Sequence, residues 1–225
     1  MDTPSAMFAL PGTKGEPWVY AFTGGRALRK VYQAENGGPT ENWKDKNGND
    51  HPHKFGDNCP QDYTNVWGHL AQKLGDGPDA AFARNARAHL LIVSKKYALT
   101  FNPNDRSEPS TAPLPKLDPD FSLSAASEFG HPDKVLLLGT SKGKATWCVW
   151  DVRAEDVSKP QEWPGRSAVN AAFWGAAGTG KKVLRVYAGN QETAHCPKLD
   201  KGVYSWPTVT AEEFWAPIYK NAPCR

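Results

Sequence analysis

Two glycine-rich segments carry the residue types that nucleophilic catalysis or phosphate binding would need. The first, Gly139-Thr140-Ser141-Lys142-Gly143, follows an apolar run, which is where an α/β hydrolase places its nucleophilic serine. Such a turn must lead into a helix, yet residues 145–150 are rich in β-branched and aromatic types and favour a strand. We therefore interpret the segment as a turn between two strands. A hydrolase built on Ser141, Asp151 and His195 is the lesser alternative, and His195 is expected in an exposed loop.

The second segment covers residues 175–182 and has the glycine spacing of a phosphate-binding loop. Lys182 replaces the serine or threonine that would hold magnesium, and the glycines precede an apolar run instead of following one. A phosphate loop runs from strand into helix, so that the helix N-terminus faces the phosphate. We therefore do not expect phosphate binding here.

A cluster of Asp50, His51, His53 and Asp57 could hold a metal ion. Such clusters occur more often in flexible polar loops than in metal sites. We predict no metal site.

Length and charge narrow the class of protein. The 225 residues, 39% of them hydrophobic, can bury a sizeable core and favour one compact unit. The formal charge of +3 is spread along the chain without a basic stripe, so nucleic acid is not an expected partner. No apolar run approaches the roughly 20 residues that cross a bilayer, so no membrane span is expected.

The cysteines point to an oxidising compartment. Cys59, Cys148, Cys196 and Cys224 are even in number and contain no Cys-x-x-Cys pair, which favours two disulfides over a zinc site and leaves three pairings open. Nine tryptophans, nineteen prolines and many turn residues suit a loop-rich extracellular domain. We expect a secreted protein whose signal peptide was removed before an added Met1.

The expected elements alternate between strands and helices. A turn-rich hairpin region, residues 1–54, precedes a unit at 55–225, and no internal repeat is apparent. Apolar and turn patterns predict strands at 18–22, 27–32, 90–93, 135–138, 146–150 and 183–187, helices at 64–74, 78–87 and 167–175, and a long surface loop at 102–119. This order predicts an α/β fold, with a helical N-terminal lobe and a partly parallel sheet flanked by helices.

Several short runs, in collinear order, resemble the ADP-ribosyl cyclases, a family of NAD glycohydrolases and cyclases. They include His89 to Lys95, Asp133 to Gly139, Thr146-Trp147-Cys148, Ala172-Phe173-Trp174-Gly175-Ala176, Val183 to Gln191, and Gly202-Val203-Tyr204-Ser205-Trp206-Pro207. Together they cover about the last two-thirds of the chain. Most of the family's cysteine positions are missing.

The resemblance implies cleavage of the nicotinamide–ribose bond of NAD. The oxocarbenium-like transition state needs a carboxylate beside the ribose, and the nicotinamide ring needs an aromatic surface. Ser205 stands where the family has its catalytic glutamate, and Val93 where it has its first tryptophan. The expected site has Ser205 and Asp133 as catalytic residues and Trp174, Ser94, Val93 and Trp147 as substrate-binding residues. A carboxylate that replaces the missing glutamate is expected from Glu192 or from Glu212 and Glu213, and Glu192 is favoured as the third catalytic residue.

Two functions follow from the altered centre. One is a secreted NAD-consuming enzyme, with NAD as substrate and no bound cofactor. The other is a non-catalytic relative that binds a nucleotide, or a host or other partner protein, as an effector. A neutral serine cannot stabilise a developing cation as a carboxylate does, so activity does not follow from the resemblance alone.

Overall fold

The computed structural model describes residues 4–24, 26–34, 39–52, 61–129, 131–165, 168–176, 182–188, 191–200 and 203–209. Strands account for 55% of the structure and helices for 8%. Every strand pair in it is antiparallel, which overturns the predicted α/β fold with its helical lobe and partly parallel sheet.

Four sheets, which we call blades 1 to 4, follow one another along the chain. Blade 1 holds β1 (Ala6–Pro11), β2 (Pro17–Phe22), β3 (Ala27–Gln33), β4 (Pro39–Thr40) and β7 (Gln61–Asp62). Blade 2 holds β8 (Ala80–Arg84), β9 (Arg87–Ile92), β10 (Tyr97–Phe101) and β11 (Ser110–Pro113). Blade 3 holds β12 (Phe121–Glu128), β13 (Lys134–Ser141), β14 (Lys144–Asp151), β15 (Asp156–Val157) and β16 (Gln161–Glu162). Blade 4 holds β17 (Ala171–Ala176), β18 (Lys182–Ala188), β19 (Gln191–His195) and β22 (Thr208–Val209).

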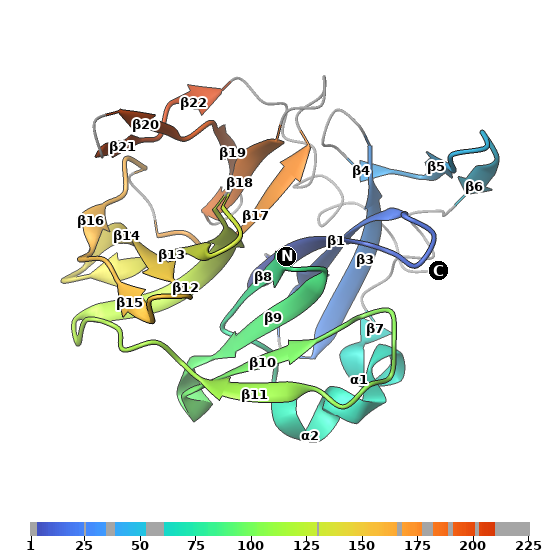
Figure 1. Ribbon diagram of the computed structural model, residues 1–225, viewed down its shortest axis with the longest axis horizontal. Helices are drawn as coiled ribbons and strands as arrows, with labels where there is room; N and C mark the ends of the chain where they lie inside the picture. The colour runs from blue at the N-terminus through green and yellow to red at the C-terminus, as the bar shows by residue number, and fades with distance from the viewer. Residues whose placement is uncertain are drawn as a thin grey trace.

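The blades surround a common axis. The first strand of each blade is its innermost one: β1 contacts β8 and β17, and β12 contacts the same two strands. Figure 1 looks down this arrangement, with the blue, green, yellow and orange sheets following one another around the centre. The architecture is that of a β-propeller, in which inner strands line the axis and later strands step outward.

The inner strands share a four-residue pattern. Alanine begins Ala6-Met7-Phe8-Ala9, Ala80-Ala81-Phe82-Ala83, Ala125-Ala126-Ser127-Glu128 and Ala171-Ala172-Phe173-Trp174, one segment in each inner strand. Small alanines let four strands approach one axis, and successive side chains point to the two neighbouring blades. This pattern is an internal repeat, so the expectation of no repeat was wrong.

Each pair of neighbouring blades encloses its own hydrophobic cluster. Phe8 and Leu90 belong to the cluster between blades 1 and 2, and Phe82 and Leu137 to the one between blades 2 and 3. Leu138 belongs to the cluster between blades 3 and 4, and a fourth cluster joins blade 4 to blade 1. The core is therefore a ring of four interfaces instead of one central layer.

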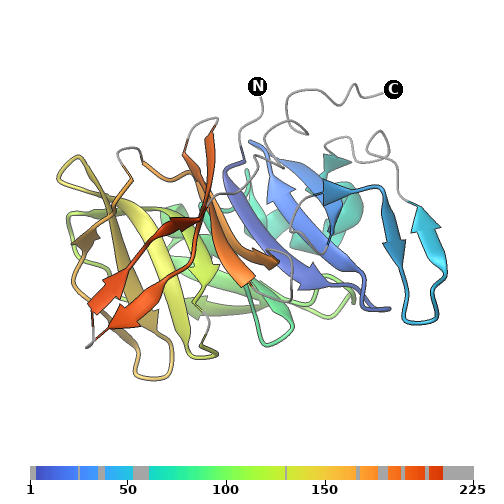
Figure 2. The same cartoon turned by 90° about the horizontal axis from the view of Figure 1, so that it is seen from above.

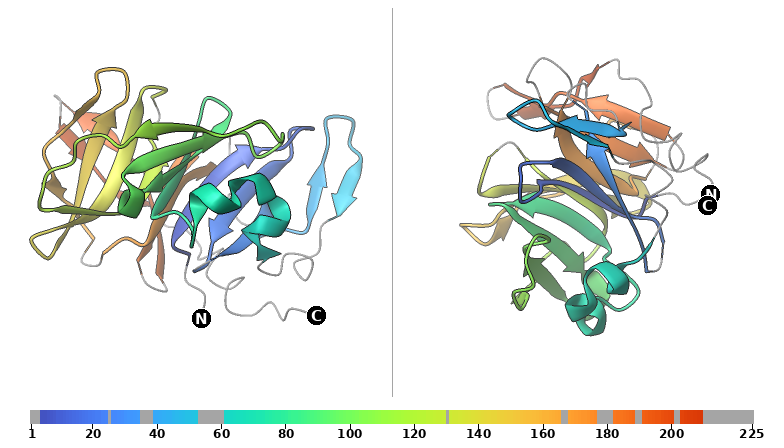
Figure 3. Two further views of the ribbon diagram at one scale, coloured as in Figure 1. Left: turned by 90° about the horizontal axis from the view of Figure 1, so that it is seen from below. Right: turned by 90° about the vertical axis from the view of Figure 1, so that its right-hand side faces the viewer.

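Short helices complete the space beside blades 1 and 2. Segments α1 (Tyr63–Val66), η2 (Gly68–Leu70) and α2 (Ala71–Leu74) supply Tyr63, Trp67 and Leu70 to the cluster between these blades. Seen from below in Figure 3, they lie over the blue strands. They occupy the region of the predicted helix at 64–74, and no helix among the described residues is long and apolar enough to cross a membrane.

Two predicted helices are strands. Residues 78–87 contain β8, a two-residue turn at Asn85 and Ala86, and the start of β9, while the predicted helix at 167–175 is largely β17. Alanine-rich sequence favours helix by propensity, but burial against both neighbouring blades overrides that preference. The expected loop at 102–119 contains β11. The strands expected at 18–22, 135–138, 146–150 and 183–187 are confirmed.

The remaining hairpins are β5 (Asn42–Lys44) with β6 (Asp50–Pro52), and β20 (Lys198–Asp200) with β21 (Val203–Ser205). The β5–β6 hairpin extends beyond the blades at the right-hand end of Figure 2. The predicted boundary at residue 54 falls in the segment 53–60, outside the described residues.

No disulfide is seen among the cysteines that the structure describes, contrary to the expectation. Cys148 is a buried free thiol in the cluster between blades 2 and 3, where burial raises its pKa to about 12, and Cys196 is also a free thiol. Cys59 and Cys224 lie outside the described residues.

Candidate functional site

The four inner strands end at one face of the propeller, and two adjoining cavities open there. They have volumes of about 350 and 380 Å³. Pro11, Arg84, Glu128 and Gly175, which stand at or near the ends of the four inner strands, line one or both. We call this region the mouth. It is lined by Ala9, Leu10, Pro11, Gly15, Pro17, Trp18, Gln33, Phe82, Ala83, Arg84, Asn85, Ala86, Glu128, His131, Pro132, Lys134, Val135, Trp174 and Gly175.

Below the mouth, the axis of the propeller is nearly filled. A cavity of only about 10 Å³ lies between residues of all four inner strands, among them Phe8, Phe82, Ser127 and Phe173. That volume is close to what one water molecule needs. Trp174 and Glu128 line this cavity and both mouth cavities, so they mark the point where the axis meets the mouth.

The repeat is broken at the mouth. Its third position is phenylalanine in three blades and Ser127 in blade 3, and its fourth position is Ala9, Ala83, Glu128 and Trp174 in blades 1 to 4. The Ser127 side chain is fully buried, and its hydroxyl has no hydrogen-bond partner among the described residues. Blades 3 and 4 therefore place a carboxylate and an indole where blades 1 and 2 have methyl groups.

An ion pair joins blades 2 and 3 at the mouth. Arg84 Nη2 lies 2.9 Å from Asp133 Oδ1, and Arg84 Nε donates to the carbonyl of Pro132. The two side chains are only 19% and 33% exposed, so the guanidinium is held in one orientation. The backbone N–H of Asp133 donates to Nδ1 of His131 over 3.2 Å, which fixes the loop that follows β12.

His89 supports the arginine from behind. Its ring stacks on Phe82 with centroids 4.8 Å apart and an interplanar angle of 2°. Nδ1 lies 3.0 Å from Thr100 Oγ1 and Nε2 lies 3.4 Å from the carbonyl oxygen of Arg84. Burial lowers the pKa of His89 to about 4, so the ring is neutral at pH 7 and can donate its single N–H to Arg84.

The turn beside Arg84 has an unusual backbone. Asn85 and Ala86 have φ angles of +50° and +57°, the two left-handed residues of a tight hairpin turn. Asparagine tolerates this region, whereas alanine is strained there. Both residues line the mouth.

The site residues expected from the sequence are dispersed. Trp174 lines the mouth, whereas Asp133 does not line it but forms an ion pair with Arg84, which does. Glu192 is buried in blade 4, where its Oε1 accepts a 2.6 Å hydrogen bond from Nη1 of Arg185. Trp147 is buried between blades 3 and 4.

The other three expected residues lie elsewhere on the molecule. Ser205 is exposed at the end of β21, opposite Lys198. Ser94 is exposed in the short helical turn η3 (Val93–Lys95), and Val93 donates its N–H to Asp79.

The alternative hydrolase is not assembled. Ser141 pairs with Lys144 at one end of the β13–β14 ladder, whereas Asp151 pairs with Lys134 at the other. Residues 142 and 143 form the turn between these strands, as predicted. His195 is buried, contrary to its expected exposure, because its ring packs against Trp163 and its Nδ1 lies 3.2 Å from the carbonyl oxygen of Trp206.

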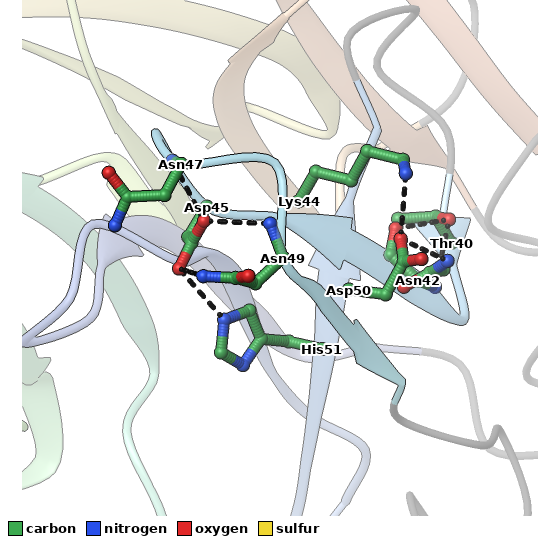
Figure 4. A network of polar contacts seen from close by, with 8 residues as sticks. All are labelled: Thr40, Asn42, Lys44, Asp45, Asn47, Asn49, Asp50 and His51. Atoms are coloured by element: carbon green, nitrogen blue, oxygen red, sulfur yellow. Dashed lines mark hydrogen bonds and ion pairs between the residues drawn. The ribbon is translucent and has the colours of Figure 1, made fainter.

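The polar β5–β6 hairpin is organised by hydrogen bonds of its own (Figure 4). Asp45 Oδ1 accepts from the backbone N–H groups of Asn47 and Asn49, and its Oδ2 accepts from Nδ2 of Asn49 over 2.9 Å and lies 3.4 Å from Nε2 of His51. These contacts, that of the Asn49 side chain foremost, hold the pKa of Asp45 far below its ordinary value. His53 and Asp57 lie outside the described residues, and the described residues contain no group of three or more metal-ligating side chains.

The mouth could have been found from the sequence through its repeat. Aligning the alanine-led segments of the four inner strands shows that Ser127, Glu128 and Trp174 depart from the pattern. Arg84 and its partner give no such signal, because they are 49 residues apart and meet only after blades 2 and 3 pack together.

Comparisons with known proteins support the fold alone. No protein-family model matches the chain, and no curated protein matches its sequence. The crystal structure of LS24, a seed albumin from Lathyrus sativus, is similar with a TM-score of 0.57 and 15% identity over 86% of each chain. Hydrazine synthase from Kuenenia stuttgartiensis has a TM-score of 0.43 and 8% identity over 95% of this chain and 68% of its own.

A mutant of the Aleuria aurantia lectin AAL, in complex with Fucα1-6GlcNAc, has a TM-score of 0.36 and 13% identity over 94% of this chain and 65% of its own. TM-scores below 0.5 do not establish a shared fold with the hydrazine synthase or the lectin. The likeness to the seed albumin agrees with the antiparallel blades, so the resemblance to ADP-ribosyl cyclases and the NAD-consuming or cyclase-like function drawn from it were wrong.

Proposed function

We propose that this protein is a binding protein that holds a small molecule in the mouth. The observation that carries the proposal is that two adjoining cavities of about 350 and 380 Å³ meet over Trp174 and Glu128, at the point where the repeat of the inner strands is broken. Ligand sites in proteins fall in the range of about 300 to 1,000 Å³ and combine apolar walls with a few polar groups.

The mouth has both kinds of surface. Leu10, Pro17 and the ring of Trp18 give it an apolar wall. Trp18 is held between Tyr32, whose ring centroid is 3.8 Å away, and Lys30, whose Nζ is 3.9 Å from the indole centroid. Such a wall is rigid before a ligand arrives, which lowers the entropic cost of binding.

The polar groups are also held in place. Arg84 is fixed by Asp133 and Pro132, and the carbonyl of Arg84 faces His89. A pre-organised set of polar groups in cavities that are also lined by the indole of Trp174 suits selective binding of one small polar molecule.

A thermal-shift screen with a library of small polar molecules tests the proposal. A ligand at 100 times its Kd stabilises the folded state by about 2.7 kcal/mol, which corresponds to a rise in Tm of roughly 5–10 °C for a chain of this size. The rise should disappear in Trp174→Ala and persist in Lys142→Gln, a change in the turn between β13 and β14. Hits that bind both variants equally would show that the mouth is not the site.

We also propose that the protein is secreted. The free thiols of Cys148 and Cys196 remove part of the argument for an oxidising compartment, and the argument from composition remains. Fractionation of the native source, with the protein followed by antibody, would test secretion.

A further inference from the structure

The charges around the mouth restrict its ligand. Two cationic side chains, Arg84 and Lys134, line the cavity between blades 2 and 3. Two carboxylates oppose them, because Glu128 lines the same cavity and Asp133 forms the ion pair with Arg84. For a ligand of either charge, the attraction to one pair of groups is offset by repulsion from the other pair, so the site gives a charged ligand little net electrostatic gain and favours a neutral one.

The hydrogen-bonding groups narrow the class further. The carboxylate of Glu128 only accepts, Arg84 only donates, and the amide of Asn85 does both. A ligand that satisfies them must carry groups that donate and accept at several adjacent positions. Hydroxyl groups do both, so a ligand with several neighbouring hydroxyls can meet a carboxylate, a guanidinium and an amide at the same time.

The apolar part of the mouth favours a ligand that has a flat, partly hydrophobic face. Trp174 is half-buried, packs against the cluster between blades 3 and 4, and lines both cavities. A large, rigid aromatic surface beside polar groups suits a ligand that has one apolar face and a polar rim.

On the premise that the mouth is the binding site proposed above, we infer that its ligand is a neutral polyhydroxylated ring, namely a saccharide unit. The C–H face of the ring stacks on Trp174, and its hydroxyls bind Glu128, Arg84 and Asn85. The two cavities share these residues, so each gives room for one unit of a linked pair. The protein is then a saccharide-binding protein with two subsites, one in each cavity, that share Trp174.

Saturation-transfer NMR with defined probes tests the inference. The neutral probes are the methyl glycosides of glucose, galactose, mannose, fucose and N-acetylglucosamine, and the charged probes are choline and glucuronate. At least one neutral glycoside should receive saturation at the ring protons of one face. Its Kd should change less than about twofold between 0.05 and 0.5 M NaCl, because a neutral ligand is not screened.

Variants connect the signal to the residues. Trp174→Ala should abolish saturation transfer. If that variant fails to fold, Trp174→Phe takes its place; it keeps a smaller ring and should weaken binding about tenfold. Glu128→Gln should weaken binding about tenfold through loss of charge-assisted hydrogen bonds. Lys142→Gln should bind like the parent protein.

Two results would overturn the inference without touching the proposed function. One is binding of choline or glucuronate, but of no glycoside, in a manner that depends on Trp174 and weakens with salt. The other is that none of these probes receives saturation, while a molecule from the thermal-shift screen binds the parent protein and binds Trp174→Ala more weakly. If no molecule in either experiment depends on Trp174, the proposed function itself is wrong.

Discussion

The mouth and the interior between the blades contain the same residue types in opposite circumstances. At the mouth, Glu128 and Trp174 are partly exposed and line three cavities. In the interior, Glu192 is paired with Arg185, and Trp147 packs edge-on against Trp206 with ring centroids 5.1 Å apart.

The difference shows that residue type does not distinguish a binding group from a structural one. Sequence reasoning assigned Glu192 and Trp147 to the site because glutamate and tryptophan suit the chemistry. Their surroundings in the structure make both residues structural. The carboxylate of Glu192 is buried and already paired with Arg185, so it cannot reach a ligand. Glu192 and Glu128 therefore form a matched pair for mutation.

The largest effect is expected for the interior glutamate. Glu192→Ala leaves the guanidinium of Arg185, whose side chain is 2% exposed, without its buried counter-charge. Such a loss costs about 3–5 kcal/mol of the free energy of unfolding, measured by urea denaturation at pH 7. Glu128→Ala, the matched change at the mouth, should cost under about 1 kcal/mol. Equal losses in the two variants would contradict the contrast.

Acid should destabilise the folded protein through His89, the residue behind Arg84. His89 is neutral in the folded protein with a pKa of about 4, whereas its pKa in the unfolded chain is about 6.5. Below pH 6.5 the unfolded chain therefore binds a proton that the folded state does not, so stability falls as the pH falls. The loss reaches about 2 kcal/mol at pH 5 and levels off near 3 kcal/mol below pH 4.

Urea denaturation at pH 7 and pH 5 measures this loss. In His89→Gln the difference between the two pH values should shrink by about 2 kcal/mol. Burial also lowers the pKa of His195, so part of the dependence should remain in that variant. An unchanged pH dependence in His89→Gln would show that the histidine is not the source.

Two serines of β12 should respond in opposite directions. Ser127 is fully buried without a hydrogen-bond partner among the described residues, so Ser127→Ala removes an unpaired hydroxyl and should stabilise the protein by about 1 kcal/mol. Ser124 donates to the carbonyl of Val169, so Ser124→Ala should destabilise it by about 1 kcal/mol. Thermal denaturation of both variants compares them; destabilisation by Ser127→Ala would reveal a partner for its hydroxyl.

The smallest effect is expected at the turn beside the mouth. Ala86 has a φ angle of +57°, which glycine adopts without strain, so Ala86→Gly should stabilise the protein by about 0.5 kcal/mol. Gly143, at +77° in the turn between β13 and β14, has open space where a Cβ would lie. Gly143→Ala should therefore destabilise the protein by about 1 kcal/mol through the backbone alone. Chemical denaturation measures both changes, and a destabilised Ala86→Gly would mean that the turn is not strained.

Local sequence pattern predicted part of this fold. The run at 135–138 was assigned correctly as a strand, because four consecutive apolar residues have few places to be buried except between two layers. The run at 183–187 was also assigned correctly, although Arg185 interrupts it. The segment 78–87 failed because alanine is ambiguous: it favours a helix in isolation and an inner strand where four blades meet. Only the recurrence of the pattern in each inner strand resolves that ambiguity.

The site was less predictable than the strands. Trp174 was assigned to a binding site on a family resemblance that the fold overturns, and its position at the mouth depends on the packing of blades 3 and 4. Glu128 was missed, because a single glutamate after a mixed segment of serine and apolar residues has no distinguishing neighbour in the sequence. Its significance is visible only by comparison with Ala9 and Ala83 at the same position of the repeat.

The nearly filled axis has a consequence for the kinetics of binding. With only about 10 Å³ between Phe8, Phe82 and Phe173, the axis is narrow below the mouth, so a ligand in the mouth enters and leaves from the face at which the inner strands end. A bulky occupant of the entrance would therefore slow dissociation and association together, leaving the equilibrium affinity of the molecule beneath it nearly unchanged. Immobilising the protein through the turn at Lys142, which strand order places at the other end of the blades, would leave that route clear.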